Sequence, residues 1–293
     1  STLCINALER AKVKYAYVNF DDERLLNITV DDLDSILEVL YKVYGDFSYL
    51  LLDEVQNVDG WHLFVNRMLR KKMHIVLTGS NSKLLSGELA SHLTGRHHQI
   101  ELLPFSFADF CAYKKITTSP LTTKNRGLLA AAFDDYMKFG GFPELMNEQD
   151  VKSYIDSLLN DIIRQDIQKR FKIKYIDTLE HLTNHLLNEA PAIIVKETLQ
   201  SLFNFNSSHT LGNYLSYLEQ TYLISTMSKY SAKSRLRIRN AKYYAIDVAL
   251  MNQRKDTFSG DSLGFILETI VYLELRRRAK HAKQDVYYYS NQR

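Results

Sequence analysis

The sequence predicts an α/β protein in which a parallel sheet with helices on both faces precedes a mainly helical region. Strand and helix patterns alternate over residues 1 to about 115, as they do in βαβ units. Two strands of that region are near-continuous apolar runs, which is typical of strands buried on both faces of a parallel sheet. From about residue 125 onward the spacing of apolar residues is mostly helical.

The alternating region opens with a helical pattern, followed by a β-branched and aromatic strand that ends in acids. The next helix has apolar residues at helical spacing and stops at Gly45. Two apolar strands follow, YLLLD ending at Asp53 and IVLTGS ending at Ser80, with a helix between them. In chain order, we expect helix 1–12, strand 13–22, helix 29–45, strand 48–54, helix 60–72, strand 73–80, helix 82–96, and a strand and turn over 97–107.

The second region begins with a helix that is broken at Gly140-Gly141. An apolar stripe over residues 151–171 predicts an amphipathic helix of five turns. The following order of three helices and a β-hairpin predicts a winged helix. Its expected parts are helices 176–189, 195–203 and 208–220 and strands 222–231 and 235–247, after which helix 265–280 and strand 285–290 close the chain.

Composition describes an ordinary globular chain of 293 residues, with 45% hydrophobic and 24% charged residues. The formal charge of +3 is too small to imply nucleic-acid binding by itself. Cys4 and Cys111 have no metal-ligand spacing, so we expect reduced thiols in a cytoplasmic protein. No apolar run approaches the roughly 18–20 residues that span a bilayer, and the sequence begins without a signal-peptide pattern.

Adjacent carboxylates follow the first apolar strand, in YLLLDEVQN. Such a pair suits a nucleotide site, with Asp53 in the shell of the nucleotide's Mg²⁺ and Glu54 orienting the attacking water. A strand that simply ends in an acidic turn has the same pattern. A complete G-x-x-x-x-G-K-[ST] phosphate loop does not occur in the sequence.

Two more features lie downstream of that pair. Thr78, Ser80 and Asn81 end the second apolar strand, and ligands bind at the carboxyl ends of such strands, so these side chains are candidates to sense the γ-phosphate. Arg96 follows a Gly hinge, and a guanidinium can stabilise charge on a transferring phosphoryl group. An ordinary turn and a solvated loop are the alternative interpretations.

In their order, the segments NFDDERL, LLLDEVQNVDGW, VLTGSNSKLLSGELASHLTGR and IELLPFSFADF resemble prokaryotic AAA-type P-loop ATPases over residues 1–145. The resemblance implies an AAA-type P-loop NTPase sheet with ATP and Mg²⁺ as cofactors. It implies that STL ends the phosphate loop, with the lysine and glycines before residue 1. Ser1 would then ligate Mg²⁺, and Thr2 would lie at the helix N-terminus, where phosphate is favoured.

The resemblance continues into a C-terminal region to which the family assigns no function. It implies a winged helix and then the first helix and strand of a restriction-endonuclease-like fold, in which Glu268 would be the helix acid. A solvated helix carboxylate is the interpretation that we favour for Glu268. The domains expected are an ATPase core at 1–120, a helical connection at 121–175, the winged helix at 176–255 and the endonuclease-like start at 256–293.

The expected hairpin carries six cations and no acid over residues 229–242. Its alternate arginines would share one strand face and could follow a nucleic-acid backbone. The same stripe could be a solvated face or a contact for the protein's own acidic helices. The candidate DNA contacts are Lys233, Arg235, Arg237 and Arg239.

Taken together, the sequence predicts an ATP-binding and ATP-hydrolysing protein whose nucleotide state is coupled to a winged-helix module. The alternative is a DNA-binding regulator or defence-type module in which ATP acts as a switch with little turnover. The expected partners are nucleotide, DNA through the hairpin, and a protein partner or a second copy of the chain, with no membrane.

Overall fold

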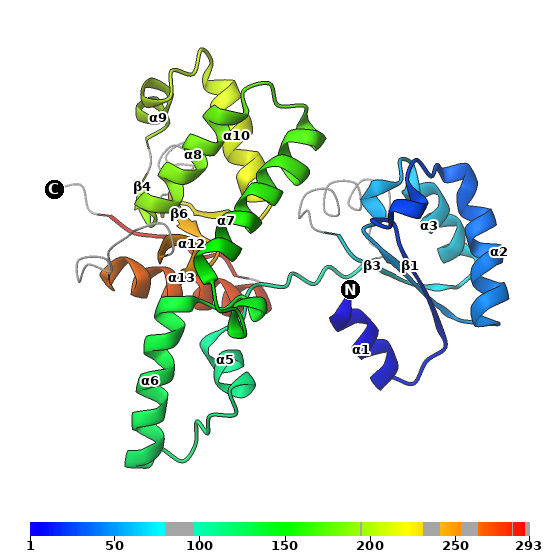
Figure 1. Ribbon diagram of the computed structural model, residues 1–293, viewed down its shortest axis with the longest axis horizontal. Helices are drawn as coiled ribbons and strands as arrows, with labels where there is room; N and C mark the ends of the chain where they lie inside the picture. The colour runs from blue at the N-terminus through cyan, green and yellow to red at the C-terminus, as the bar shows by residue number, and fades with distance from the viewer. Residues whose placement is uncertain (80–96, 194, 231–240, 253–262, 283, 291–293) are drawn as a thin grey trace. The chain divides into compact units, whose positions relative to one another are not determined.

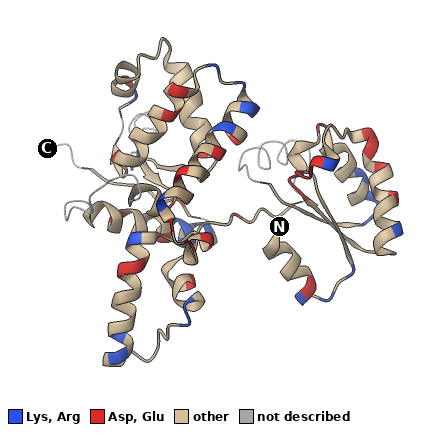
Figure 2. Ribbon diagram, in the orientation of Figure 1, with Lys and Arg blue, Asp and Glu red and all other residues tan. Residues whose placement is uncertain are grey.

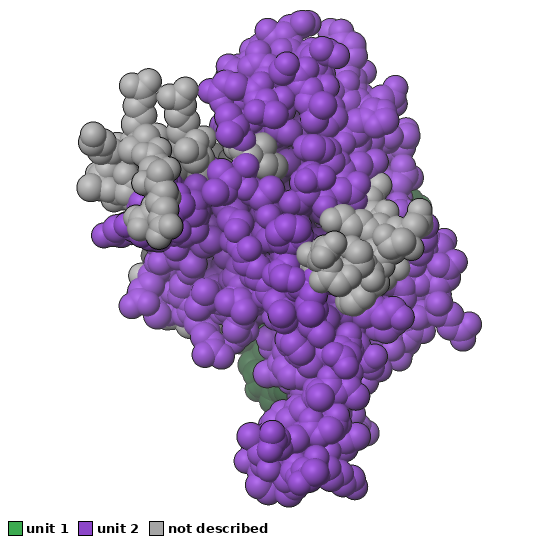
Figure 3. All heavy atoms as spheres, turned by 90° about the vertical axis from the view of Figure 1, so that its left-hand side faces the viewer, with its two compact units in different colours: residues 1–101 green, residues 102–293 purple. Residues whose placement is uncertain are grey.

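A computed structural model describes residues 1–79, 97–193, 195–230, 241–252, 263–282 and 284–290 of the chain (Figure 1). The chain divides into two compact units, Ser1–Glu101 and Leu102–Arg293, which Figure 3 shows in different colours. Each unit has its own core of buried apolar side chains. We therefore describe each unit by itself.

The first unit is built around a parallel sheet of three strands in the order β1-β2-β3. This confirms the parallel α/β sheet that the apolar runs predict. Consecutive strands are joined through helices, as parallel pairing requires. In chain order the elements are α1 (Thr2–Arg10), β1 (Tyr15–Asn19), η1 (Glu23–Leu25), η2 (Val30–Asp32), α2 (Leu33–Tyr44), β2 (Tyr49–Asp53), η3 (Val55–Asn57), α3 (Trp61–Arg70) and β3 (His74–Leu77).

The central strand β2 supplies the middle of this core. Leu50, Leu51 and Leu52 are at most 2% exposed, as expected for a strand covered on both faces. The stop of α2 at Gly45 is also confirmed, because Gly45 adopts φ 71°, a conformation that favours glycine. The buried central strand and the end of α2 at Gly45 thus define the sheet and its carboxyl edge.

The strand β3 is less covered than β2. Its residues Ile75, Val76 and Leu77 are half-buried and His74 is exposed. In the part of the chain that the structure describes, β3 pairs with β2 alone. Its other edge therefore presents main-chain groups along an apolar strand.

The second unit is mainly helical and holds a small antiparallel sheet in the order β4-β6-β5. Its helices bury apolar faces in one large core that includes Ile155, Leu182, Leu211 and Tyr244. In chain order the elements are α5 (Phe107–Tyr113), α6 (Thr123–Phe139), η5 (Pro143–Met146), α7 (Val151–Asp161), η6 (Ile162–Lys169), α8 (Ile176–Glu189), β4 (Ala192–Ile193), α9 (Lys196–Leu202), α10 (Ser208–Gln220), β5 (Ile224–Met227), β6 (Lys242–Ala245), α12 (Ala249–Asn252) and α13 (Leu263–His281).

The five-turn helix expected over 151–171 is α-helical in its first part, α7, and continues as the π-helix η6. Its buried residues Ile155, Leu159, Ile163 and Ile167 are each four apart. On a regular α-helix such residues drift round the axis by about 40° per step, since a turn holds about 3.6 residues. The wider π turn opposes that drift and keeps the last two isoleucines on the buried face.

Two expected strands are not formed. Residues 97–103 are irregular, and Ile100 and Leu102 are 82% and 63% exposed. Near the C-terminus, only an isolated bridge forms between Lys229 and Tyr288. In both places the expected pattern is present, but among the described residues no strand lies alongside to form a ladder.

None of the described helices combines the length and the apolar character that a membrane crossing requires. Both cysteines, Cys4 and Cys111, are free thiols.

Candidate functional site

The carboxyl ends of the three parallel strands gather polar side chains at one edge of the first sheet. Asn19 at the end of β1 lies opposite Asp53 at the end of β2. Thr78 directly follows β3, and its main-chain nitrogen donates to the carbonyl of Leu52 at 3.1 Å. Ligands of open α/β sheets bind at this edge, so it is the candidate site.

Asp53 is the centre of that edge and is only 3% exposed. Tyr17 of β1 donates its hydroxyl to Asp53 Oδ2 at 2.9 Å, and the hydroxyl of Thr78 donates to Asp53 Oδ1. Burial acts to raise the pKa of Asp53, but the hydrogen bonds from Thr78, Tyr17 and Ser1 together outweigh it, so the pKa lies below its usual value. Asp53 is therefore ionised at neutral pH although it is buried.

The beginning of α1 lies at the same carboxylate. Ser1 is the N-cap of α1, and its main-chain nitrogen is 4.0 Å from Asp53 Oδ1. Thr2 is the first residue of the helix. The structure thus brings Ser1, Thr2, Asp53 and Thr78 together, at a helix N-terminus where the helix dipole favours an anion.

Glu54 ends the strand in a backbone conformation that is uncommon for a residue with a side chain. Its φ and ψ are 52° and 41°, in the left-handed region. Its carboxylate Oε2 accepts a hydrogen bond from Gln56 Nε2 at 2.5 Å. Residues in such strained conformations cluster at functional sites, and here the conformation turns the chain sharply after Asp53.

The donor set at this edge suits Mg²⁺ carried by a nucleotide. Mg²⁺ prefers oxygen ligands and is usually held by one or two carboxylates together with substrate phosphates. The ionised carboxylate of Asp53 and the hydroxyls of Ser1 and Thr78 supply such oxygens. The described ranges contain no group of three or more His, Cys, Asp or Glu residues that could hold a metal ion.

Several predicted site residues fall outside the described residues. These are the sensor residues Ser80 and Asn81 and the arginine Arg96, as well as the hairpin cations Lys233, Arg235, Arg237 and Arg239. Their roles stay predictions.

Tyr17 is a site residue that sequence reasoning missed. It stands in YAYVN two residues before Asn19, so the alternation of a strand places both on one face. The sequence thus shows that Tyr17 and Asn19 share a strand face, but it does not show that β1 pairs with β2. Only that pairing brings the phenol to the carboxylate.

Glu268 is not the solvated carboxylate that we favoured. Its side chain lies on α13 and is 40% exposed. Its Oε1 accepts from the ammonium of Lys242 and from the hydroxyl of Tyr244, the latter at 2.9 Å. The carboxylate of Glu268 thus ties α13 to β6.

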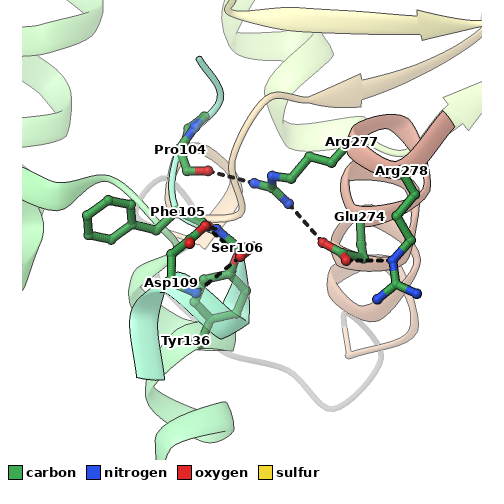
Figure 4. Close-up of polar contacts among 8 residues, drawn as sticks. All are labelled: Pro104, Phe105, Ser106, Asp109, Tyr136, Glu274, Arg277 and Arg278. Carbon is green, nitrogen blue, oxygen red and sulfur yellow. Dashed lines mark hydrogen bonds and ion pairs between the residues drawn. The ribbon is translucent and has the colours of Figure 1, made fainter. Parts of the chain in front are cut away.

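A second polar cluster lies inside the second unit and holds the first residues of that unit (Figure 4). Arg277 of α13 donates to the carbonyl of Pro104 at 2.6 Å, and Tyr136 of α6 donates to the carbonyl of Phe105 at 2.7 Å. The main-chain nitrogen of Phe105 donates to the carbonyl of Gly141 at 2.7 Å. We call this set of contacts on Pro104 and Phe105 the linker anchor.

The buried Asp247 fixes the glycine pair that forms part of the linker anchor. Its Oδ2 accepts from the main-chain nitrogen of Gly141 and its Oδ1 from that of Ala249, both at 2.8 Å. A side chain at Gly140 would place its Cβ 1.7 Å from Asp247 Oδ1, and one at Gly141 would lie 2.2 Å from the carbonyl oxygen of Phe105. Both glycines are therefore required by close approach.

Burial raises the pKa of Asp247 to about 6, although the two main-chain N–H groups and the charge of Arg277 act against the rise. Burial also raises the pKa of Tyr136, and the negative charge of Asp247 adds to that effect. This cluster is enclosed in the second unit, and we interpret it as structural.

Comparison with known proteins agrees with the division of the chain. Residues 1–111 match a family model described as an AAA domain, and residues 130–260 match a model described as a domain of unknown function, DUF8612. The first match supports an AAA-type, ATPase-like domain in the first unit, with a P-loop-like fold.

Two relatives are similar over most of this chain, and both are described as uncharacterized. One is uncharacterized protein MJ1544 of Methanocaldococcus jannaschii, 35% identical over 285 residues that cover 94% of this chain and 64% of the relative. The other, from Haemophilus influenzae, is 32% identical over 271 residues that cover 89% of this chain and 66% of the relative. This chain thus spans just under two thirds of the length of each.

Proposed function

We propose that the first unit binds ATP with Mg²⁺ and hydrolyses it. The observation that carries the proposal is Asp53, a buried carboxylate that is held in its ionised form at the carboxyl edge of a parallel sheet. The N-terminus of α1 lies 4.0 Å away. An ionised carboxylate beside a helix N-terminus suits a metal-bound polyphosphate, and the match to an AAA domain supports this assignment.

In this proposal each residue has one task. Asp53 and the hydroxyl of Ser1 hold the metal, Thr2 lies against phosphate, and Thr78 supports Asp53. Glu54 orients the attacking water. Bound Mg²⁺ would supply positive charge against the phosphate oxygens. We assign the remaining polar contacts to the γ-phosphate and its transition-state charge to Ser80, Asn81 and Arg96.

We place the phosphate loop before Ser1, as the resemblance to AAA-type ATPases implies. Two observations support this placement. The first turn of α1 begins beside Asp53, where a loop entering that helix would meet the metal. Among the described residues, the outer edge of β3 has no partner strand and is apolar and half-buried, so it suits pairing with the strand that leads into such a loop.

We further propose that the second unit contains a winged helix coupled to the nucleotide state. The elements α8, β4, α9, α10, β5 and β6 follow the order helix, strand, helix, helix, strand, strand. The sheet order β4-β6-β5 places the first short strand beside the last, which is the arrangement of a winged-helix sheet. The endonuclease-like continuation after α13 stays a proposal as well.

The linker anchor supports the coupling. Pro104 and Phe105 follow the first unit by only a few residues, and their carbonyls are fixed by Arg277 and Tyr136. Because a fixed segment transmits displacement better than a free one, a change at the end of the first unit would reach the body of the second. We infer that this segment is the mechanical connection between them.

ATP turnover by the full-length protein tests the proposed reaction. We expect Glu54→Gln to lower kcat by about 10²-fold or more, because a positioned base typically contributes that much, while ATP affinity stays near the wild-type value. Glu38→Gln is the matched control, since Glu38 is exposed on α2 and its substitution should leave kcat unchanged. Equal turnover by the Glu54 variant would remove Glu54 from the mechanism, and failure of the wild type to bind ATP would remove the proposal itself.

A second candidate function is a DNA-binding regulator in which ATP acts as a switch with little turnover. The winged-helix order favours it, together with the hairpin cations Lys233, Arg235, Arg237 and Arg239. Charges of both signs are interspersed along the described helices (Figure 2), so those helices offer a DNA backbone no single basic stripe. The hairpin is therefore where the DNA contact would lie.

Salt-dependent DNA binding distinguishes this candidate from the first. If the hairpin contacts phosphates, replacing Arg235, Arg237 and Arg239 by glutamine should weaken binding to all sequences alike. It should also reduce the slope of log affinity against log salt by about one per phosphate contact. An unchanged slope would exclude the hairpin. Single-turnover kinetics on the wild type would then show whether bound ATP is hydrolysed or merely held.

A further inference from the structure

We propose that Tyr17 is a positioning residue for the metal carboxylate, and that its hydroxyl holds Asp53 in the orientation that binds the nucleotide's Mg²⁺. This inference rests on the proposed function of the first unit. It adds to that function a residue outside the acidic pair, the sensor strand and the start of α1.

The Asp53 carboxylate is held from two neighbouring strands. Tyr17 on β1 donates to Oδ2 at 2.9 Å, and Thr78 after β3 donates to Oδ1. Each carboxylate oxygen offers two lone-pair directions, so one direction on each stays available after these bonds form. Two donors on opposite oxygens also prevent rotation of the group. The carboxylate plane is therefore set before any ligand arrives.

The burial of Asp53 makes the phenol hydroxyl hard to replace. Only 3% of Asp53 is exposed, so little water can reach the carboxylate in place of Tyr17. Loss of the hydroxyl would therefore leave a buried carboxylate oxygen without its donor, which is costly.

The groups facing this pair are known on each packed element. Asp53 meets Tyr17 from β1, Thr78 from the end of β3 and Ser1 from the start of α1. Tyr44 at the end of α2 acts on Tyr17 at longer range and also raises its pKa. Asp53 is the carboxylate that these groups surround.

The phenol ring and the phenol hydroxyl have separable tasks. The ring of Tyr17 is half-buried and packs in the sheet, and phenylalanine would reproduce that packing. The hydroxyl alone reaches Asp53. Tyr17→Phe therefore removes the hydrogen bond and keeps the ring, which separates a positioning role from a packing role.

The experiment uses the full-length protein, with Mn²⁺ as the probe and ADP as the nucleotide. Mn²⁺ binding is followed by electron paramagnetic resonance. We expect Tyr17→Phe to weaken Mn²⁺ binding in the presence of ADP by about tenfold, as loss of a hydrogen bond to a metal ligand typically does. ADP affinity without metal should not change.

Tyr15→Phe is the matched control. Tyr15 lies on the same strand and the same face two residues earlier, and its hydroxyl is engaged with Glu9 rather than with Asp53. The same chemical change at position 15 should leave Mn²⁺ affinity at the wild-type value. Thr78→Val removes the second donor and should act in the same direction as Tyr17→Phe.

Wild-type Mn²⁺ affinity in Tyr17→Phe would overturn this inference. A wild-type protein that binds no Mn²⁺ with ADP would instead overturn the proposed function. If Tyr17→Phe loses its native circular dichroism, 4-fluorophenylalanine at position 17 replaces it in the test, because it fills the space of the hydroxyl and donates no hydrogen bond. That variant should weaken Mn²⁺ binding in the same way, and unchanged Mn²⁺ affinity in it would equally contradict the role of Tyr17.

Discussion

Asp53 in the first unit and Asp247 in the second have similarly small exposed fractions, but their pKa values are shifted in opposite directions. They are 3% and 2% exposed. The pKa of Asp53 lies below its usual value, whereas burial raises the pKa of Asp247 to about 6. Each carboxylate accepts two hydrogen bonds, and Asp53 has Ser1 beside it as well. The exposed fraction alone therefore does not explain the difference.

The position of each carboxylate explains it. Asp53 lies at the edge of a sheet, beside the N-terminus of α1 and two hydroxyl donors. Asp247 lies inside the core of the second unit, where Gly140, Gly141 and Phe105 come close together. A buried acid at an edge is available to a ligand, while one in a core acts on its own chain. The three following variants test this comparison.

Gly140→Ala should have the largest effect, because it inserts a methyl group against Asp247. The added Cβ would lie 1.7 Å from Asp247 Oδ1, and Gly140 has φ 74°, which is unfavourable for alanine. We expect a loss of about 3 kcal/mol or more in the stability of the second unit, in the range of strained and overpacked core sites. Hydrogen exchange of peptides from residues 130–190 would measure it.

Gly127→Ala is the matched control, since Gly127 lies inside α6 and nothing is within 4 Å of an added Cβ. There alanine should stabilise the helix by about 1 kcal/mol. A Gly140 variant as stable as the Gly127 variant would show that Asp247 can move away, and the enclosed character assigned to it would be wrong.

The pH dependence of the second unit should report Asp247. Because the folded pKa of about 6 lies above the ordinary value of about 3.9 for a free aspartate, the folded state holds the proton more tightly than the unfolded state. Stability therefore falls as pH rises from about 4 to above 6, by about 3 kcal/mol in all. In Asp247→Asn that contribution should vanish. Urea unfolding between about pH 4 and pH 7, followed by hydrogen exchange of peptides from the second unit, would measure how the free energy of unfolding changes with pH. The same change in the wild type and in Asp247→Asn would refute the raised pKa.

Asp53 should give a smaller effect of opposite sign. Its folded pKa is lowered, so its contribution to stability is present above the unfolded pKa and is lost as pH falls through the folded one. Asp53→Asn should flatten this loss on the acid side. Trp61 is the only tryptophan and lies buried in the first unit, so its fluorescence follows that unit alone. If the stability of the wild type instead fell between about pH 4 and pH 6 and Asp53→Asn removed that fall, Asp53 would belong in the same class as Asp247.

Local patterns predicted the helices well because their signals are complete within a few turns. The helices expected at 176–189 and 208–220 are formed as α8 and α10 with the same bounds. The parallel sheet and the stop at Gly45 also follow from local residues. Both kinds of signal depend on the spacing of apolar residues and on glycine, which the sequence shows directly.

Contacts between distant segments were the part that reasoning from sequence missed. Tyr17 and Asp53 are 36 residues apart, and Gly141 and Asp247 are 106 apart. The π winding of η6 likewise depends on what its isoleucines pack against. The glycine pair was visible as a helix break, but its need for glycine comes from Asp247 and Phe105. Asp53 and Glu54 are adjacent in the sequence and were recognised, whereas Tyr17 is distant in the sequence and was not.

The linker anchor also orders events during synthesis of the chain. Pro104 is made 173 residues before its partner Arg277. At about 5–20 residues per second, that interval lasts roughly 9–35 s. Throughout it, the first unit can already fold on the ribosome while the segment after Glu101 lacks its attachment to α13. The linker anchor is therefore completed only after Arg277 is made, once the first unit has had time to acquire its sheet.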